Sequence, residues 1–181
     1  MSKTRKSNYK NTKSYKKWIK KVGEASLAPK NKDKQDDLCT SKTRKADGSK
    51  FCEGSIGIER KYMPQLNIPK FTKTLKHKYK VPVQNKQIRP SDLKPAQGEI
   101  RKSKVMEIVK SMKKGKKKNP NGKIVVSEDG YVVDGHHRWA ASLIKAPDTP
   151  IPAIVIKAGI TDSLGMAAAM GAKTIAFGGA L

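Results

Sequence analysis

The chain has 181 residues and carries 40 Lys and Arg against 15 Asp and Glu, a formal net charge of +25. An imbalance of this size indicates a polyanionic partner, and nucleic acid is the usual one. No run of 18 or more apolar residues occurs, so we expect no membrane partner, and the basic N-terminus lacks the apolar segment of a secretory signal.

Only two cysteines occur, Cys39 and Cys52. Two are too few for a disulfide scaffold, and this usage is typical of a reducing compartment. A zinc site would need two further ligands, and His77 is the only nearby histidine, so we expect no metal site.

Residues 1–50 are rich in Lys, Ser, Asn, Thr and Asp and contain few apolar residues. Such a segment buries too little surface to offset its chain entropy, so we expect a basic arm that is disordered alone. Tyr15, Trp18, Ile19 and Val22 recur at helical spacing and predict a short basic helix. This helix either docks on its own domain or contacts nucleic acid or another partner. The contacting residues would be Lys16, Lys17, Lys20 and Lys21.

Residues 51–80 contain Pro64 and Pro69 among apolar residues, which argues against a long helix. We expect an extended strap lying on the domain or on a neighbouring chain.

The compact domain is predicted over residues 81–157. Strands are expected at 81–83, 87–88, 124–126, 131–133 and 150–156, and helices at 100–112 and 139–144. The pair Asp129-Gly130 predicts a hairpin turn between two of these strands. This order indicates a small mixed sheet of the α/β (α+β) class. A basic loop follows the first helix and is either solvated or in contact with a phosphate backbone. Its lysines are Lys113, Lys114, Lys116, Lys117 and Lys118.

The tail, residues 158–181, is dominated by Gly, Ala and Met. A helix is possible around Met166 and Met170. We expect the tail to pack against the domain or against a neighbouring protein.

The run Asp134-Gly135-His136-His137-Arg138 joins a predicted strand to a predicted helix. Free amides at a helix N-terminus attract anions, and an arginine fork fits phosphate oxygens. The run is therefore a candidate phosphate-binding turn. The structural alternatives are that the histidines only cap the helix and that Arg138 pairs with Asp134 or Glu128.

The segment Val83–Ile156 resembles the ParB/sulfiredoxin superfamily. The matching stretches are VQNKQIRPSDLKPAQGEI, KVMEIVKSM, KIVVSEDGYVVDGHHRWAA and IPAIVI. The resemblance implies a ParB/sulfiredoxin-like helix–hairpin–helix arrangement in which the glycine-led turn cradles nucleotide phosphates. The turn reads DGHHR as in free serine kinases of that superfamily. Sulfiredoxin has its catalytic cysteine at the position of His136, so its chemistry is not expected here.

The resemblance also implies roles for individual residues. Gly135, His136, His137 and Arg138 would contact phosphates together with Asp134, Gln97 would touch the nucleotide, and Glu99 would act as a catalytic base. Independently of any family, a carboxylate near bound phosphates can orient a nucleophile. Glu99 is equally compatible with an ordinary position in the first turn of a helix.

Three functions follow as hypotheses. The first is a ParB-like nucleotide-binding protein associated with nucleic acid, with CTP, ATP or ADP as ligand and Mg²⁺ as a possible companion. The second is a small-molecule kinase of the free serine kinase type. The third is a structural or packaging protein of a bacteriophage that keeps the fold as a scaffold. We expect contacts with other protein subunits through the arm, strap and tail. We expect a location in the cytoplasm or inside a phage virion.

Overall fold

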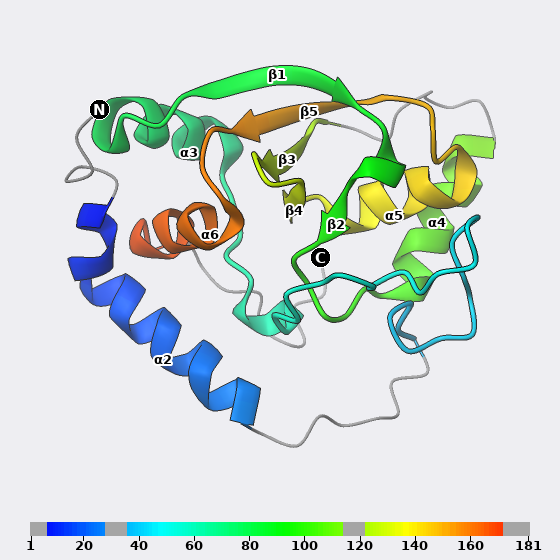
Figure 1. The fold of residues 1–181 in the computed structure, drawn as a ribbon, viewed down its shortest axis with the longest axis horizontal. Coiled ribbons are helices and arrows are strands. Elements are labelled where there is room, and N and C mark those ends of the chain that lie inside the picture. Colours follow the sequence, from blue (N-terminus) through cyan, green and yellow to red (C-terminus); the bar gives the residue numbers. More distant parts are fainter. Residues whose placement is uncertain (1–6, 28–35, 114–121, 172–181) are drawn as a thin grey trace.

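A five-stranded mixed sheet forms the centre of the computed structural model, which describes residues 7–27, 36–113 and 122–171 (Figure 1). The strand order is β1-β5-β3-β4-β2, in which β5 runs antiparallel to β1 and parallel to β3, and β4 runs antiparallel to β3 and parallel to β2. The predicted α+β class with a small mixed sheet is therefore confirmed. The strands are β1 (Val83–Ile88), β2 (Lys94–Pro95), β3 (Ile124–Ser127), β4 (Tyr131–Asp134) and β5 (Ile151–Ile156).

The predicted hairpin joins β3 to β4. Gly130 has a φ of 84°, a left-handed conformation that suits the Asp-Gly turn. The hydroxyl of Ser127 donates a hydrogen bond to Asp129, and the backbone N–H of Tyr131 donates to the same hydroxyl oxygen. Because these contacts are local, the turn could be predicted from the sequence.

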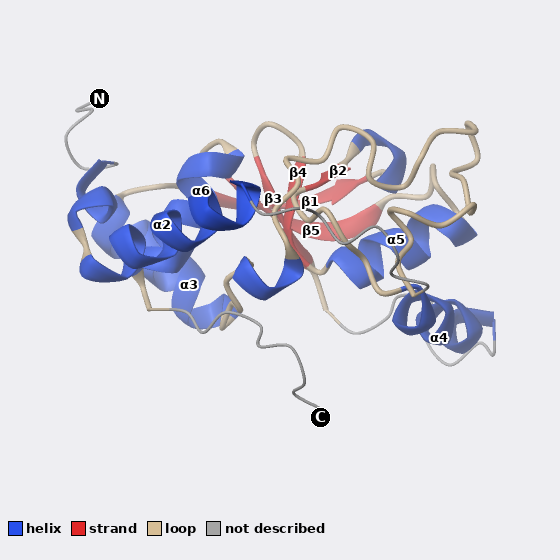
Figure 2. Cartoon of the chain, turned by 90° about the horizontal axis from the view of Figure 1, so that it is seen from below, coloured by secondary structure: helices blue, strands red, loops and turns tan. Residues whose placement is uncertain are grey.

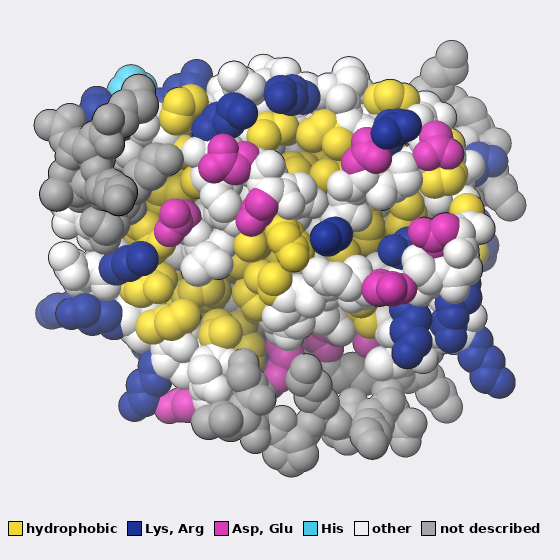
Figure 3. Space-filling view, viewed as in Figure 1, with side chains coloured by type: hydrophobic (Ala, Val, Ile, Leu, Met, Phe, Trp, Pro, Cys, Tyr) yellow, Lys and Arg dark blue, Asp and Glu magenta, His cyan; other side chains and the backbone are white. Residues whose placement is uncertain are grey.

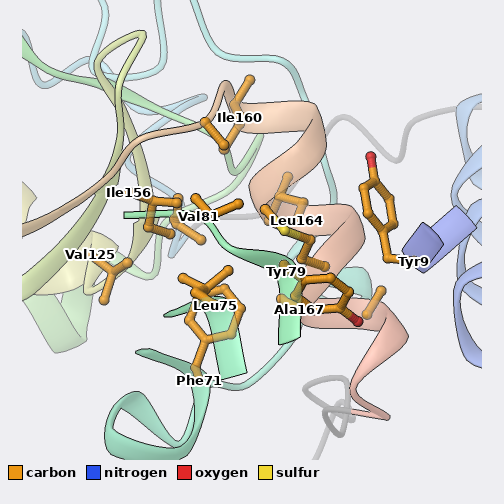
Figure 4. Packing of buried hydrophobic residues seen from close by; sticks show 14 of the residues in the cluster. Tyr9, Phe71, Leu75, Tyr79, Val81, Val125, Ile156, Ile160, Leu164 and Ala167 are labelled. Carbon is orange, nitrogen blue, oxygen red and sulfur yellow. The ribbon is translucent and has the colours of Figure 1, made fainter. Parts of the chain in front are cut away.

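Helices lie on two sides of the sheet. Figure 2 shows α2 (Lys13–Leu27), α3 (Ile68–Thr74) and α6 (Ile160–Ala169) at one end and α4 (Lys102–Lys113) and α5 (His136–Lys145) at the other. Each group covers its own apolar cluster. In the first, Val125 and Ile156 of the sheet pack toward Leu164 of α6 (Figure 4). In the second, Trp139 is fully buried and donates from Nε1 to the carbonyl of Pro90 at 2.9 Å.

The described parts of the expected arm pack against the domain. Tyr9 and Trp18 are buried, and the indole of Trp18 donates to the carbonyl of Tyr62 at 2.7 Å. The hydroxyl of Tyr9 donates to Asp162 of α6 at 2.5 Å. For residues 7–27 the structure therefore shows the docked alternative. Three aromatic or apolar anchors, Tyr9, Trp18 and the partly buried Val22, outweigh the low overall hydropathy of the segment.

The strap is extended only in part. Residues 68–79 are helical, first as α3 and then as a π-helical turn, Leu75–Tyr79, which ends at left-handed Lys80. The expectation of an extended strap is wrong for these residues, because Pro69 lies in the first turn of α3. A proline there removes no helical hydrogen bond.

A loop of residues 36–53 covers the start of α4. Asp37 accepts hydrogen bonds through Oδ1 from the backbone N–H of Ile100 at 2.8 Å and of Cys39 at 3.0 Å. Cys39 and Cys52 form a disulfide within this loop, with Cα atoms 5.0 Å apart. The sequence associated these two cysteines with a reducing compartment, in which disulfides are rare. In the structure the loop nevertheless folds back on itself around buried Leu38 and Phe51 and brings the two sulfurs together.

The tail contributes the apolar helix α6, which begins six residues before the expected 166–170 and ends at Ala169. Over the described residues, no helix combines the length and the hydropathy needed to cross a membrane.

Candidate functional site

The turn between β4 and α5 has the geometry of an uncapped helix N-terminus. Gly135 is the N-cap residue, has a φ of 90° and offers no side-chain cap. A Cβ on Gly135 would lie 2.8 Å from Ile124 Cγ2 and 2.9 Å from Arg138 Nη2, so both the conformation and the space require glycine. The first amides of α5 lack intrahelical acceptors, which makes this end of the helix electropositive.

The imidazole of His136 is hydrogen-bonded to backbone amides. Its ring is 3% exposed, and Nε2 accepts hydrogen bonds from the backbone N–H groups of Ala96 at 3.2 Å and Gln97 at 3.3 Å. Burial and then the neighbouring His137 lower the pKa of His136 to about 3, against an opposing hydrogen bond with the backbone of Val132. The neutral ring therefore fastens the 96–97 segment to the start of α5, a structural role that differs from the helix cap expected as the alternative for this histidine.

His137 lies among positive charges. Burial, followed by Arg60, Lys104 and Arg101, lowers the pKa of His137 to about 4, while Asp36 acts in the opposite direction. The Nε2 atom of His137 is buried and has no hydrogen-bond partner among the described residues. A buried polar atom without a partner, near more cations than carboxylates, is an arrangement that a bound anion would complete.

Arg60 comes from a short 3-10 turn of the strap, Arg60–Tyr62. Its Nε is buried without a partner among the described residues, and burial, followed by Arg101, lowers the pKa of its guanidinium, while Glu99 acts in the opposite direction. The backbone N–H of Arg60 donates to Oε1 of Glu99 at 3.2 Å. Glu99 precedes α4 and is 9% exposed, so its buried carboxylate fixes the position of the strap beside α4.

Arg138 and Asp134 form the ion pair that was the structural alternative for this arginine. Their nearest charged atoms are 3.8 Å apart. A Cβ on Gly122 would lie 3.0 Å from Arg138 Nη1, so the guanidinium also lies against the segment that enters β3. Burial raises the pKa of Asp134, and Arg138 counteracts this shift.

A cleft of about 270 Å³ opens beside the turn. Gln97 is 4% exposed, and its Oε1 is buried without a partner. Four buried side-chain polar atoms lack a partner in the described ranges, and three of them, on Arg60, Gln97 and His137, belong to residues around this turn. The cleft is lined by Met63, Pro64, Gln65, Leu66, Gln97, Val133, Asp134 and His136.

The structure thus brings together Gln97, Glu99 and the whole run 134–138. It adds three cations that the sequence had not singled out, namely Arg60, Arg101 and Lys104. Arg101 and Lys104 follow Glu99 at the start of a predicted helix, a position from which basic side chains can reach the next helix. No local signal connects Arg60 to this group.

The predicted nucleic-acid contacts are partly described. Lys16, Lys17, Lys20 and Lys21 are exposed on α2, where Lys20 pairs with Glu24 at 3.8 Å. Lys113 ends α4, and Lys114, Lys116, Lys117 and Lys118 lie outside the described residues. In the described ranges, no group of three or more His, Cys, Asp or Glu is placed to hold a metal ion.

Comparisons with known proteins add no relative. No family model, curated protein or solved structure matches this chain, and the resemblance to the ParB/sulfiredoxin superfamily therefore stays a prediction.

Proposed function

We propose that this chain binds the phosphate groups of a nucleotide where α5 begins, and that it works in association with nucleic acid. The observation that carries the proposal is the cation cluster around His137, formed by Arg60, Arg101 and Lys104. Two members of this cluster, Arg60 and His137, keep buried polar atoms without partners.

Two energetic costs are present in the unbound protein. A buried polar atom without a hydrogen bond costs about 1 to 3 kcal/mol. Arg60 also lies close enough to Arg101 for the two charges to disfavour each other. A phosphate group supplies negative charge and several acceptor oxygens, so it relieves both costs. The start of α5, which has no side-chain cap, adds backbone donors to the same turn.

The link to nucleic acid is supported by charge. The net charge of +25 far exceeds what a single nucleotide site needs. The lysines of α2 face solvent, while its aromatic residues face the domain. On the face drawn in Figure 3, Lys and Arg side chains are spread around the rim and no single basic patch stands out. The net positive charge itself favours contacts with phosphate backbone, which carry no sequence readout.

The kinase hypothesis has less support. A general base must reach the hydroxyl that it activates, whereas Oε1 of Glu99 accepts a hydrogen bond from the Arg60 amide. Phosphate transfer and the phage scaffold role both remain predictions from the sequence.

Isothermal titration calorimetry with ATP, ADP, CTP and pyrophosphate tests the proposal. Arg101→Gln removes one exposed cation of the cluster, just before α4, and Lys110→Gln removes an exposed cation within α4. We expect micromolar or tighter binding of at least one nucleotide, weakened at least about tenfold by Arg101→Gln because one charge-assisted contact is lost, and unchanged by Lys110→Gln. Absence of binding, or equal losses in the two variants, would overturn it.

A further inference from the structure

We propose that the disulfide between Cys39 and Cys52 regulates the anion site, and that its reduction by a thiol weakens anion binding. This inference rests on the proposed phosphate site and names how that same site is controlled. It starts from the loop that the disulfide closes, residues 39–52, and from the chain segments on either side of this loop, residues 36–38 and 53–60.

The segment before the loop holds the backbone at the start of α4. The N–H of Leu38 donates to the carbonyl of Ile100 at 2.8 Å. The carboxylate of Asp36 accepts hydrogen bonds from the N–H and from the hydroxyl of Ser103, each at 2.6 Å. Between these two contacts lies Arg101 of the cation cluster. The position of its guanidinium therefore depends on the segment before the loop.

The segment after the loop is hydrogen-bonded to the residues that lead into the same stretch. The N–H of Ile58 donates to the carbonyl of Ala96 at 3.2 Å, and the carbonyl of Ile58 accepts from the N–H of Gly98 at 2.8 Å. Two residues further along is Arg60. The two segments and the disulfide that joins them therefore form a clamp, and this clamp places both Arg60 and Arg101 of the cluster.

The two arginines disfavour each other in the folded protein. Burial and then the charge of Arg101 lower the pKa of the Arg60 guanidinium, against the effect of Glu99. Their proximity therefore depends on the backbone that carries them, and a looser clamp lets them separate. After burial and the three cations of the cluster, Asp36 has the smallest effect on the pKa of His137. Displacement of Arg101 should therefore outweigh the loss of the Asp36 carboxylate from the cluster.

Both cysteines are of intermediate exposure, which gives a thiol access to the disulfide. A dithiol reduces it through a mixed disulfide: the S–S bond of the protein breaks, two electrons and two protons pass to the cysteines, and the dithiol leaves as a cyclic disulfide. Reduction removes a cross-link between residues 13 positions apart, so the chain gains more entropy when the loop opens. Leu38 and Phe51 stay buried in the closed loop, so we expect local opening and not unfolding.

Hydrogen exchange of single amides, measured by NMR on the full chain with and without dithiothreitol, tests the clamp. The thiols of this reagent are protonated at pH 7, so it does not compete with an anion. Reduction should speed the exchange of the Leu38 and Ser103 amides at least about tenfold. The control is the amide of Val81, which donates to the carbonyl of Leu75 at 2.9 Å in the other apolar cluster and should keep its rate.

Calorimetry measures the anion site in the same two states, with the tightest ligand among ATP, ADP, CTP and pyrophosphate as probe. We expect reduction to weaken binding at least about fivefold, because the arrangement that binds is then populated only part of the time. Reoxidation should restore the affinity. The double variant Cys39→Ser/Cys52→Ser should bind as weakly as the reduced protein and should not respond to dithiothreitol.

Equal affinity in the oxidised and reduced protein would overturn the inference and leave the phosphate site intact. So would faster exchange at Val81 to the same extent, since the disulfide would then stabilise the whole fold, and so would free thiols in the protein without reductant. Absence of binding by pyrophosphate and by all three nucleotides in both states would overturn the proposed function, and this inference with it.

Discussion

His136 and Gln97 are joined by a hydrogen bond of 3.3 Å in which the backbone N–H of Gln97 donates to Nε2 of the imidazole. The contact links the first residue of α5 to the wall of the cleft. It fixes the ring as an acceptor and leaves the next residue, His137, to face the cations. His136 therefore has a structural role, and His137 is the candidate residue for binding an anion.

Replacement of His136 by alanine should destabilise the fold. The amides of Ala96 and Gln97 would both lose their acceptor in a buried position, at about 1 to 3 kcal/mol each. We expect the free energy of unfolding to fall by about 2 to 5 kcal/mol in urea denaturation. His77→Ala, at an exposed histidine, is the control and should change little. A loss below about 1 kcal/mol for His136→Ala would show that the bridge is unimportant.

Acid should destabilise the protein through the two buried histidines, His136 and His137. The pKa values of His136 and His137 are lowered to about 3 and about 4 in the folded state, from an ordinary value of 6.5. Below about pH 6.5 the two imidazoles therefore bind protons in the unfolded chain but stay neutral in the folded protein. Stability that is fully present above this pH is lost as the pH falls toward about 4, by up to about 1.4 kcal/mol per pH unit for each histidine. The raised pKa of Asp134 works in the opposite direction.

Urea midpoints measured across this pH range in phosphate-free buffer check the slope. His137→Gln removes one titrating group, so the slope should decrease to that of a single histidine. A midpoint that is constant between about pH 6.5 and about pH 4.5 would contradict the burial of both rings.

The contact of Tyr9 with α6 depends on Gly165. A Cβ on Gly165 would lie 3.0 Å from Tyr15 Cε2 and closer still to Tyr9 Cε2. Gly165→Ala should therefore cost about 1 to 3 kcal/mol of unfolding free energy through overpacking, although alanine is the better helix former. Gly23→Ala is the matched control, since nothing lies within 4 Å of a Cβ there, and it should gain about 0.5 to 1 kcal/mol. Thermal or urea unfolding that ranks the two variants the other way would show that residues 7–27 do not dock on α6.

Local signals in the sequence predicted much of the fold. The strand–turn–strand unit of β3 and β4, the glycine at the start of α5 and the apolar stripe of α4 each depend on residues close together in the chain. Elements of this kind confirm that the spacing of apolar residues and turn residues carries secondary structure.

Contacts between distant residues were not predictable in the same way. Tyr9 and Asp162 are 153 positions apart, and Arg60 and Glu99 are 39 apart. The high lysine content of the first 50 residues predicted a disordered arm, although Tyr9 and Trp18 of this segment are buried in the structure. The sequence therefore predicted only the part of the site at the start of α5. The cations contributed by the strap and by the segment around the start of α4 became apparent only in the three-dimensional structure.

DNA binding should depend steeply on salt if the lysines of α2 contact phosphate backbone. Each phosphate contact contributes about −0.9 to the slope of log K against log salt concentration. Replacement of the four exposed lysines 16, 17, 20 and 21 by glutamine should therefore make this slope shallower by about 3 to 4. Fluorescence anisotropy with a duplex of mixed sequence measures it. The control replaces four exposed lysines on other elements, Lys50, Lys94, Lys110 and Lys145, and has the same net charge. An equal change of this slope in the two quadruple variants would indicate that DNA is attracted by the overall positive charge and not by an interface on α2.

The central claim is that an anion completes the surroundings of His137, and an NMR titration of this imidazole with and without pyrophosphate tests it most directly. His137→Gln identifies the signal. Without ligand the pKa should be about 4, because the ring is buried and faces Arg60, Lys104 and Arg101. Bound pyrophosphate should raise the pKa, since negative charge next to the ring favours its protonated form. Binding should accordingly tighten as the pH falls from the raised pKa of the complex toward about 4, the pKa of the free protein. An unchanged pKa at saturating pyrophosphate would contradict the account.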